Sequence, residues 1–412
     1  MLAIDGGPRV RTKPFPPRRL FGEEEKQAAM RLFDAAIASG GVFGYNGPEE
    51  QAYEKEFAEY MGGGFADAVN SGTSAVFVSL GALQLDPGSE VIVPPITDPG
   101  GVMPVVMLNC VPMVCDAAPG SFNMGPKQVM DCLTERTKAI ICAHIAGEPV
   151  DMDPILKLAK QRGIAVIEDC AQSHGARYKG RLCGSMGTFG AFSTMSGKHH
   201  ATGAQGGVVF TKDEELYWRA KRFADRGKPF NLSGATSNVV AGLNLNLNDL
   251  SAAIGRVQLR KLPAIVASRR KAAEAIRTAL DKKAKAVSLG WQVAKGESAY
   301  WFMRIHLDLA KLKVDKARFV QALSAEGIPA TVSYRHIPSE ATWFKNRAVF
   351  GKSGWPWTCP AYKGDPNRQF PCPNAIESTD THFITGVHEN YGDAEVRDIV
   401  EALLKVEKAY LK

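Results

Sequence analysis

Short apolar runs rich in β-branched residues recur along the middle of the chain and alternate with helical stretches. The runs that predict strands lie near residues 91–95, 112–116, 139–144, 165–169, 189–193 and 206–211. Strands that alternate with helices favour a mainly parallel sheet covered by helices on both faces. The pattern therefore predicts an α/β fold.

Three further helices are indicated by the residues at their ends. Acidic residues begin a helical stretch from about Glu23 to Ser39, and Gly40–Gly41 ends it. Pro48 suits a first helical position and begins a second stretch that continues through Glu59. The last expected helix runs from Ala394 to Tyr410.

The chain is expected to form two domains, because its 412 residues exceed the ~250–300 at which a single core usually stops growing. After Asn248 the sequence becomes helix-rich and basic, and two later mixed segments resemble strands of a smaller α+β domain. We place a large domain at residues 23–255 and a small C-terminal domain at 256–412. The preceding residues 1–22 form an arm whose order depends on packing against another surface, often that of a partner subunit.

Hydropathy argues against a membrane protein. The hydrophobic fraction of 45% and the charged fraction of 23% are ordinary for soluble globular proteins. The longest apolar run, residues 102–115, contains two prolines and is shorter than the ~18–20 residues of a membrane span. The N-terminus lacks the continuous apolar core of a signal peptide.

Charge and cysteine usage favour a cytoplasmic protein that does not bind nucleic acid. The net charge of +7 is dispersed along the chain, and no nucleic-acid motif accompanies it. The eight cysteines include no CxxC pair, and several lie in apolar strand-like runs, as reduced core residues do. No metal site is predicted.

A candidate phosphate cradle lies at the start of an expected helix. Gly72, Thr73 and Ser74 precede the apolar run VFVSLGAL. Free backbone N–H groups and the positive end of the helix dipole favour an anion there. The simpler alternative is an ordinary helix N-cap, since serine and threonine cap helices of every function.

Two polar residues follow the apolar strand at 165–169. Ligands of open α/β sheets collect at the carboxyl ends of strands, so Asp169 is expected to face a site. A carboxylate there can keep a pyridine nitrogen protonated, and Gln172 could reach the same ring. Strand-end aspartates also cap the helices that follow them, which is the structural alternative.

The segment Ser193 to Lys198 delivers a serine at a strand end and then a lysine on a glycine-containing turn. A lysine beside a buried site can lose its proton and attack an aldehyde. An exposed lysine is the plain alternative. The combination of anion cradle, strand-end acid, serine and lysine favours one cofactor site.

Several segments resemble the sugar aminotransferase family known as DegT/DnrJ/EryC1/StrS, within the fold type I pyridoxal-phosphate enzymes. They run from LAIDGGPRVRTKPFP through SGTSAV, VIEDCAQSHGARYKGRLCGSMGTFGAFS and GLNLNLNDLSAAIGRVQL into the C-terminal domain. The VIEDCAQSHGARYKG segment is highly specific. The resemblance implies an aspartate aminotransferase-like fold, with a large, mainly parallel sheet domain and a smaller α+β C-terminal domain.

The same resemblance implies pyridoxal 5′-phosphate (PLP) as cofactor. Gly72, Thr73 and Ser193 would bind its phosphate. Asp169 would bind the pyridine nitrogen, and Gln172 would lie on the side of the ring hydroxyl.

Lys198 stands five residues after Ser193, where the family has the lysine that holds the cofactor as a Schiff base. Asn244 matches an asparagine that reaches the phosphate of the neighbouring subunit. A homodimer with shared active sites is therefore implied, as suits a twofold interface.

The chain departs from the family pattern at several positions. Asp98 stands where the family has an aromatic residue that stacks on the cofactor ring. Gln205 replaces a carboxylate and Asn246 a basic residue. His199 and His200 follow the lysine directly, and either a role in holding the turn or one in proton transfer is open.

The resemblance implies transamination between glutamine or glutamate and a keto-sugar or keto-cyclitol. The N-terminal LAIDGGPRVRTKP resembles the branch that acts on keto-cyclitols and aminoshikimate-type precursors of antibiotics. One alternative is a nucleotide-sugar dehydratase of the same family, in which a histidine replaces the lysine. Another is a non-catalytic regulator that binds the cofactor or a sugar as a signal.

Overall fold

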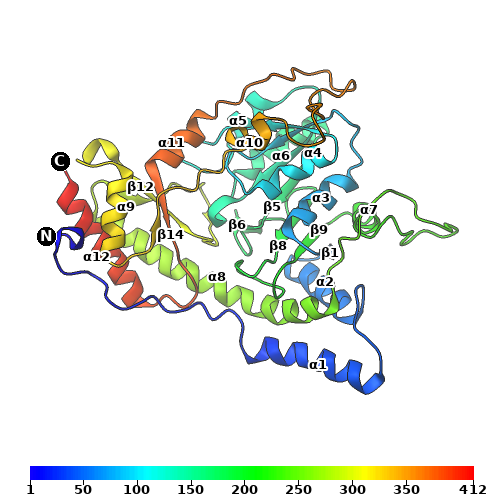
Figure 1. Cartoon of the computed structure of the whole chain (residues 1–412), viewed down its shortest axis with the longest axis horizontal. Helices are drawn as coiled ribbons and strands as arrows, with labels where there is room; N and C mark the ends of the chain where they lie inside the picture. The colour runs from blue at the N-terminus through cyan, green and yellow to red at the C-terminus, as the bar shows by residue number, and fades with distance from the viewer.

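The computed structural model describes all 412 residues, with a seven-stranded sheet at the centre of its larger part (Figure 1). The strands lie in the order β1-β9-β8-β5-β4-β2-β3. They are β1 (Phe65–Val69), β2 (Glu90–Val93), β3 (Val111–Val114), β4 (Thr137–Ala143), β5 (Ala165–Asp169), β8 (Phe189–Ser193) and β9 (Gly207–Thr211). Strand β9 runs antiparallel to both its neighbours, and every other pairing is parallel. The predicted α/β fold with a mainly parallel sheet is confirmed.

Helices cover both faces of this sheet. They are α2 (Pro48–Tyr60), α3 (Gly72–Ala82), α4 (Met103–Met107), α5 (Pro126–Cys132), α6 (Met152–Arg162), α7 (Glu214–Ala224) and α8 (Asp249–Lys283). Successive strand residues point to opposite faces, so Ile141 packs with α3, α4 and α7, whereas its neighbour Ile140 packs with α5 and α6. Helices α2 and α8 cover the part of the second face around Phe192 and Phe210.

A smaller sheet forms beyond α8, in the order β10-β12-β14-β13. Its strands are β10 (Val287–Leu289), β12 (Met303–Leu307), β13 (Ala330–Thr331) and β14 (His382–Thr385). Helices α9 (Lys316–Ala325) and α12 (Asp393–Tyr410) pack on it and share a core with the second half of α8. Helix α8 also contributes Leu259 to the core of the larger part, beside the seven-stranded sheet. Residue 255, the expected domain boundary, therefore lies within a helix that belongs to both cores.

The remaining elements are short or lie outside the two cores. They are α1 (Glu23–Ser39), α10 (Thr342–Lys345), α11 (Pro373–Thr381), a small sheet of β6 (Arg177–Tyr178), β7 (Arg181–Leu182) and β11 (Gly296–Glu297), and 3-10 turns η1 (Ala3–Asp5), η2 (Pro99–Gly101), η3 (Ile145–Gly147), η4 (Leu309–Lys311) and η5 (Pro338–Glu340). Between α10 and α11 the chain returns to the large part, where Trp357 joins a core. None of the helices combines the length and the apolar character needed to cross a membrane.

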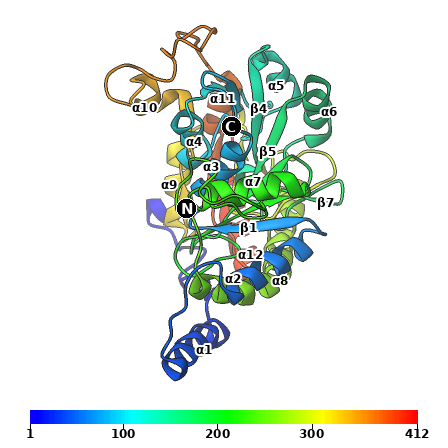
Figure 2. The same cartoon turned by 90° about the vertical axis from the view of Figure 1, so that its right-hand side faces the viewer.

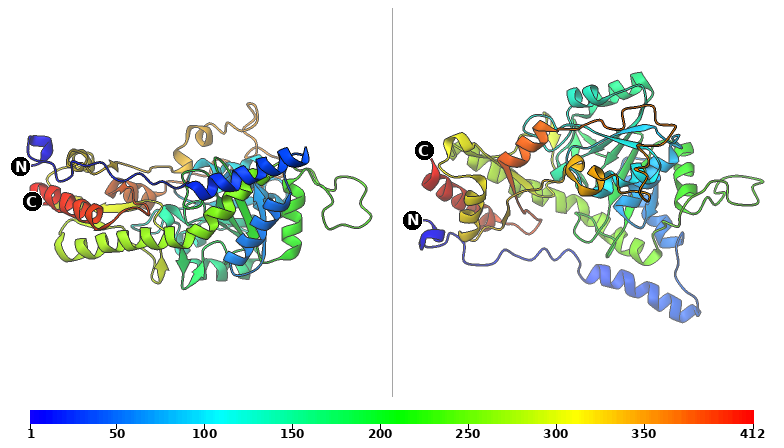
Figure 3. Two further views of the ribbon diagram at one scale, coloured as in Figure 1. Left: turned by 90° about the horizontal axis from the view of Figure 1, so that it is seen from below. Right: turned by 45° about the horizontal axis from the view of Figure 1, so that its top comes forward.

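The N-terminal arm runs from the small sheet to α1 along the outside of the molecule (Figure 3). Leu2 is buried in the small core, and Arg11 forms ion pairs with Glu395 and Asp398 of α12. Helix α1 then projects from the body and packs against α8, as Figure 2 shows from the side. The arm is therefore ordered by contacts within its own chain.

Candidate active site

A cavity of about 250 Å³ lies at the carboxyl ends of β4, β5 and β8. It brings together these predicted site residues: Gly72, Thr73, Asp169, Gln172, Ser193 and Lys198. Parallel strands place their carboxyl ends on one edge of the sheet, so side chains from distant positions meet there. Ser74 and Asn244 do not line the cavity of their own chain.

Lys198 lies on a turn closed by a hydrogen bond from its own backbone N–H to the carbonyl of Met195 at 2.9 Å. Its amine forms no hydrogen bond and lies 4.4 Å from the centre of the Trp301 ring. Burial lowers the pKa of Lys198, while the nearby charges of Asp169 and Asp98 oppose the shift. Desolvation therefore favours the neutral, nucleophilic amine.

Asp169 ends β5 and presents one carboxylate oxygen to the open space. Oδ1 accepts a hydrogen bond from the Ala171 amide at 3.0 Å, whereas no protein group donates to Oδ2. A Cβ added to Gly101 would come within 3.0 Å of Oδ2, so this glycine keeps the approach to the carboxylate open. Burial raises the pKa of Asp169, and the Ala171 amide and Lys198 act against it. A cationic N–H placed at Oδ2 would complete its hydrogen bonding.

The start of α3 lies against the end of β8 and forms the other wall. A Cβ on Gly72 would lie 2.5 Å from Cβ of Ser193, so only glycine allows the helix to approach this closely. The first N–H groups of a helix have no intrahelical acceptor, and those of Gly72 and Thr73 are available to an anion. The Ser74 hydroxyl instead donates to Asn70 Oδ1 at 2.6 Å, and the N-cap is Ser71, whose hydroxyl accepts from the Ser74 amide at 3.0 Å.

Gln172 is held on both sides of its amide. Oε1 accepts from the Ala146 amide at 2.8 Å, and Nε2 donates to the Tyr334 hydroxyl at 2.8 Å. Burial raises the pKa of Tyr334 to about 12. Sequence reasoning did not identify Tyr334, which comes from the C-terminal part of the chain and has no local motif.

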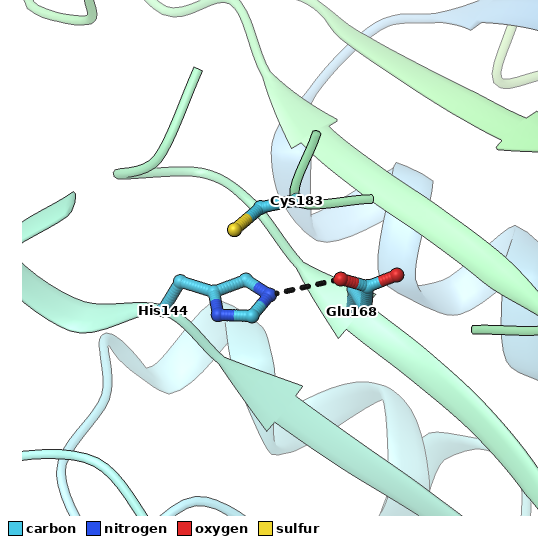
Figure 4. A group of neighbouring side chains, drawn as sticks. All are labelled: His144, Glu168 and Cys183. Carbon is cyan, nitrogen blue, oxygen red and sulfur yellow. Dashed lines mark hydrogen bonds and ion pairs between the residues drawn. The ribbon is translucent and has the colours of Figure 1, made fainter. Parts of the chain in front are cut away.

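His144 is a second residue that sequence reasoning missed, although its place at the end of β4 is the same signal that identified Asp169. It lines the cavity, and its Nδ1 accepts from the Val150 amide at 3.0 Å. Nε2 therefore carries the proton and faces Glu168 Oε2 at 3.1 Å, beside Cys183 (Figure 4). The backbone amides of Gly184, Met186 and Gly187 also donate to Glu168. The Glu168 carboxylate therefore has a structural role, in which it fixes the loop before β8.

His199 and His200 tie the end of the lysine turn to other segments of the chain, and neither lines the cavity. Both are fully buried; His199 Nε2 lies 2.9 Å from the Ala299 carbonyl, and His200 Nε2 lies 3.1 Å from the Gly255 carbonyl. Burial lowers the pKa of His200 to about 4 and that of His199 well below its ordinary value. Both are neutral near pH 7, which favours the turn-holding role.

Asp98, Gln205 and Asn246 lie in different surroundings. Asp98 is exposed at the cavity wall, where Oδ1 accepts from the Gly100 amide at 3.0 Å and begins η2. Gln205 lines the cavity. Asn246 lies outside it and donates to Asn244 Oδ1 at 2.7 Å.

The cavity residues fit the chemistry of PLP. A helix N-terminus faces the end of β8, a carboxylate oxygen without a donor lies on one wall, and a half-buried lysine whose amine makes no hydrogen bond lies on another. These groups match an anionic phosphate, a pyridinium N–H and an aldehyde.

Comparison with known proteins extends the similarity beyond the site. A model of the DegT/DnrJ/EryC1/StrS aminotransferase family matches residues 23–404. L-glutamine:2-deoxy-scyllo-inosose aminotransferase of Streptomyces lividus is 31% identical over 354 residues, which cover 82% of this chain and 81% of that protein. GDP-perosamine synthase of Caulobacter vibrioides is 32% identical over 67% of this chain and 73% of its own length. The X-ray structure of an aminotransferase from Psychrobacter cryohalolentis superposes with a TM-score of 0.83 at 29% identity, over 96% of this chain and 99% of that one.

Proposed function

Because this chain belongs to the DegT/DnrJ/EryC1/StrS aminotransferase family, we propose that it transfers an amino group from glutamine or glutamate to a keto-sugar or keto-cyclitol. It is a pyridoxal-phosphate-dependent transaminase. The proposal therefore concerns its donor, its acceptor and its site residues. The observation that carries it is the unpaired amine of the half-buried Lys198, which lines the same cavity as Asp169 and the start of α3.

Each cavity wall is assigned one part of the cofactor. Gly72, Thr73 and Ser193 would hold the phosphate, and Asp169 the pyridine nitrogen. When bound, PLP supplies an aldehyde for the exchange of amines and a ring that accepts electrons.

Lys198 would hold the cofactor and, once displaced by the donor amine, act as the general base. Its amine would accept and carry the proton of the donor's α-carbon. Burial lowers the pKa of this amine and so favours its neutral, basic form. Asp169 would keep the ring nitrogen protonated, because a carboxylate in a desolvated site favours a neighbouring cation.

A hydroxyl-rich acceptor suits the outer part of the cavity. Thr97, Asp98 and Gln205 line it and offer hydroxyl, carboxylate and amide groups that can bind sugar or cyclitol hydroxyls. A second cavity of about 290 Å³ shares Thr97 and provides room beyond the first. Two relatives are named for a keto-cyclitol and for a nucleotide-linked amino sugar. We assign the product to amino sugar or aminocyclitol biosynthesis, including that of antibiotics.

The working unit is proposed to be a homodimer in which Asn244 completes the phosphate site of the partner. Asn244 is exposed and lies on the segment between α7 and α8, part of which projects from the body (Figure 1). Helix α1 carries a row of exposed apolar side chains, Met30, Phe33 and Ile37, at helical spacing. Such a row favours burial against a second copy.

The enzyme is also proposed to be cytoplasmic. All eight cysteines are unpaired and buried. Reduced cysteines in this number are typical of compartments that do not form disulfides.

The function is tested by incubating the protein with PLP, glutamine or glutamate, and a panel of keto-cyclitols and nucleotide-linked 4-keto sugars. Mass spectrometry should detect an aminated product with the native protein and none with Lys198→Ala. Borohydride reduction and peptide mapping should place the cofactor on Lys198.

The same panel separates the two alternatives. Loss of a hydroxyl without gain of nitrogen would indicate the dehydratase, which the presence of Lys198 disfavours. Binding of cofactor or sugar without turnover of any donor would indicate the regulator.

A further inference from the structure

Arg18, on the N-terminal arm, reaches across to the turn that carries Lys198. Its Nη1 donates to the carbonyl of Gly197 at 2.9 Å, and its Nη2 donates to the carbonyl of His199 at 3.3 Å. These carbonyls flank Lys198 in the chain. No other side chain and no backbone amide donates to either of them.

The guanidinium is itself fixed by the loop before α12. Arg18 Nε donates to Glu389 Oε1 at 2.8 Å, and the other oxygen of Glu389 pairs with Arg269 Nε at 3.0 Å. Despite burial, which acts to raise it, Arg269 and Arg18 hold the pKa of Glu389 below its ordinary value. The carboxylate is therefore ionised at neutral pH and orients both arginines.

The backbone of the arm is held at the same place. His388 Nε2 lies 2.9 Å from the Pro16 carbonyl, and Asn390 Nδ2 donates to the carbonyls of Pro17 and Arg18 at 3.0 and 2.6 Å. The backbone of Arg18 is thus fixed, and so is the point from which its side chain extends to the lysine turn. It joins three parts of the chain that are far apart in sequence.

We propose that Arg18 is a positioning residue that aims the Lys198 side chain into the cavity by fixing the carbonyls of the residues before and after it, Gly197 and His199. The proposal rests on the role proposed for Lys198. With both flanking carbonyls held, rotation of the Lys198 backbone is restricted and its amine has fewer positions to sample. A reacting group displaced by about 1 Å can lose on the order of 10²-fold in rate.

The geometry requires an arginine. Its planar fork presents separate N–H groups to two carbonyls and a third to Glu389, and charged donors make stronger hydrogen bonds. A lysine would offer one point charge and could not span the three acceptors in this arrangement. Arg18→Lys therefore tests geometry while keeping the charge.

The first test uses the cofactor-free protein. In Arg18→Ala, hydrogen exchange of the Ser196 and Lys198 amides, which bond to the Ala204 and Met195 carbonyls, should become about 10-fold faster. The pH midpoint for acylation of Lys198, followed by mass spectrometry, should move up toward the ordinary 10.5 as the amine gains water.

Arg19→Ala is the matched control. Arg19 is the next residue, has the same side chain and is exposed, and it takes no part in any hydrogen bond or ion pair. Exchange, acylation midpoint and thermal stability should all remain native in this variant. An equal change in the Arg19 variant, or none in the Arg18 variant, would overturn the proposal.

The second test uses the PLP-loaded enzyme. Turnover should fall about 10- to 100-fold in Arg18→Ala, less in Arg18→Lys, and by less than twofold in Arg19→Ala. If Arg18→Ala does not fold, Glu389→Gln keeps the guanidinium and removes its charged anchor, so it should still accelerate exchange in the turn. Native exchange in a folded Glu389→Gln variant together with native turnover in Arg18→Lys would refute the positioning role. A borohydride label on another lysine would instead refute the proposed function, while the exchange data would still report on Arg18.

Discussion

At the scale of single residues, Asp169 is the group on which the proposed electron withdrawal depends. Asp169→Asn should preserve the fold but lower the turnover number on the order of 10²- to 10³-fold, as removal of a preorganised charge does elsewhere. Steady-state kinetics with saturating PLP measures this loss. Near-native turnover would mean that another group faces the pyridine nitrogen.

The raised pKa of Asp169 also leads to a prediction about the stability of the cofactor-free protein. Because burial raises its pKa in the folded protein, the folded state binds this proton more tightly than the unfolded chain does. Stability therefore falls as the pH rises above the ordinary value of 3.8. Asp169→Asn should raise Tm at pH 7, and the gain should vanish below pH 3.8. An unchanged Tm at pH 7 would contradict this sign.

A substitution at Asp98 tests whether the absence of an aromatic residue at this position weakens cofactor binding. Asp98→Phe should lower the Kd for PLP about 2- to 10-fold, since an aromatic contact contributes about 0.5–1.5 kcal/mol. Equilibrium dialysis with the cofactor provides the measurement. Asp98→Asn, which keeps the shape without the ring, is the control and should leave Kd close to that of the native protein.

At the scale of elements, strand β1 is joined to its neighbours by a buried ion cluster. Lys221 of α7 pairs with Asp67 of β1 at 2.9 Å and with Glu54 of α2 at 3.3 Å. Burial raises the pKa of Glu54 to about 8, and Lys221 acts against this shift. Lys221 is therefore the cation that compensates two buried acidic side chains at this edge strand.

Lys221→Met should destabilise the protein by about 3–5 kcal/mol, because it leaves buried carboxylates without their cation. Urea unfolding measures the free energy. Lys212→Met changes an exposed lysine close to the same helix and should alter stability by less than about 0.5 kcal/mol. A similar small effect at Lys221 would show that the cluster does not hold β1 in place.

At the scale of the whole molecule, shared active sites predict complementation between two impaired chains, assayed at a PLP concentration that leaves the Asn244→Ala chain empty. Asn244→Ala should weaken retention of PLP, and Lys198→Ala should abolish turnover. In a mixed dimer both lesions fall in one site and the other site is intact, so activity should recover to about a quarter of the native value if subunits mix at random in equal amounts. Mixtures that stay inactive, or a fully active monomer in sedimentation, would exclude the shared site.

The sequence by itself determined most of the central sheet and named the residues to which its chemistry is assigned. Strand β8 and helix α1 have the bounds that the pattern predicts, because short β-branched runs and helix-ending glycines are local signals. Asp169 and Lys198 could be named for the same reason, since a strand end and a glycine turn are visible in the chain. Strand β1 was missed because Asp67 interrupts its apolar run, and only its ion pair with Lys221 explains burial there.

Only the tertiary structure decided how distant segments complete the site. Arg18 and Tyr334 have no motif of their own, and their partners lie far along the chain, so no local pattern reports them. His199 and His200 could not be assigned from sequence because either role suits two histidines after a lysine. Their burial beneath the turn, with carbonyl partners more than fifty residues away, distinguishes the two roles. Periodicity records which face of an element is buried, whereas burial against a particular partner depends on how the elements pack.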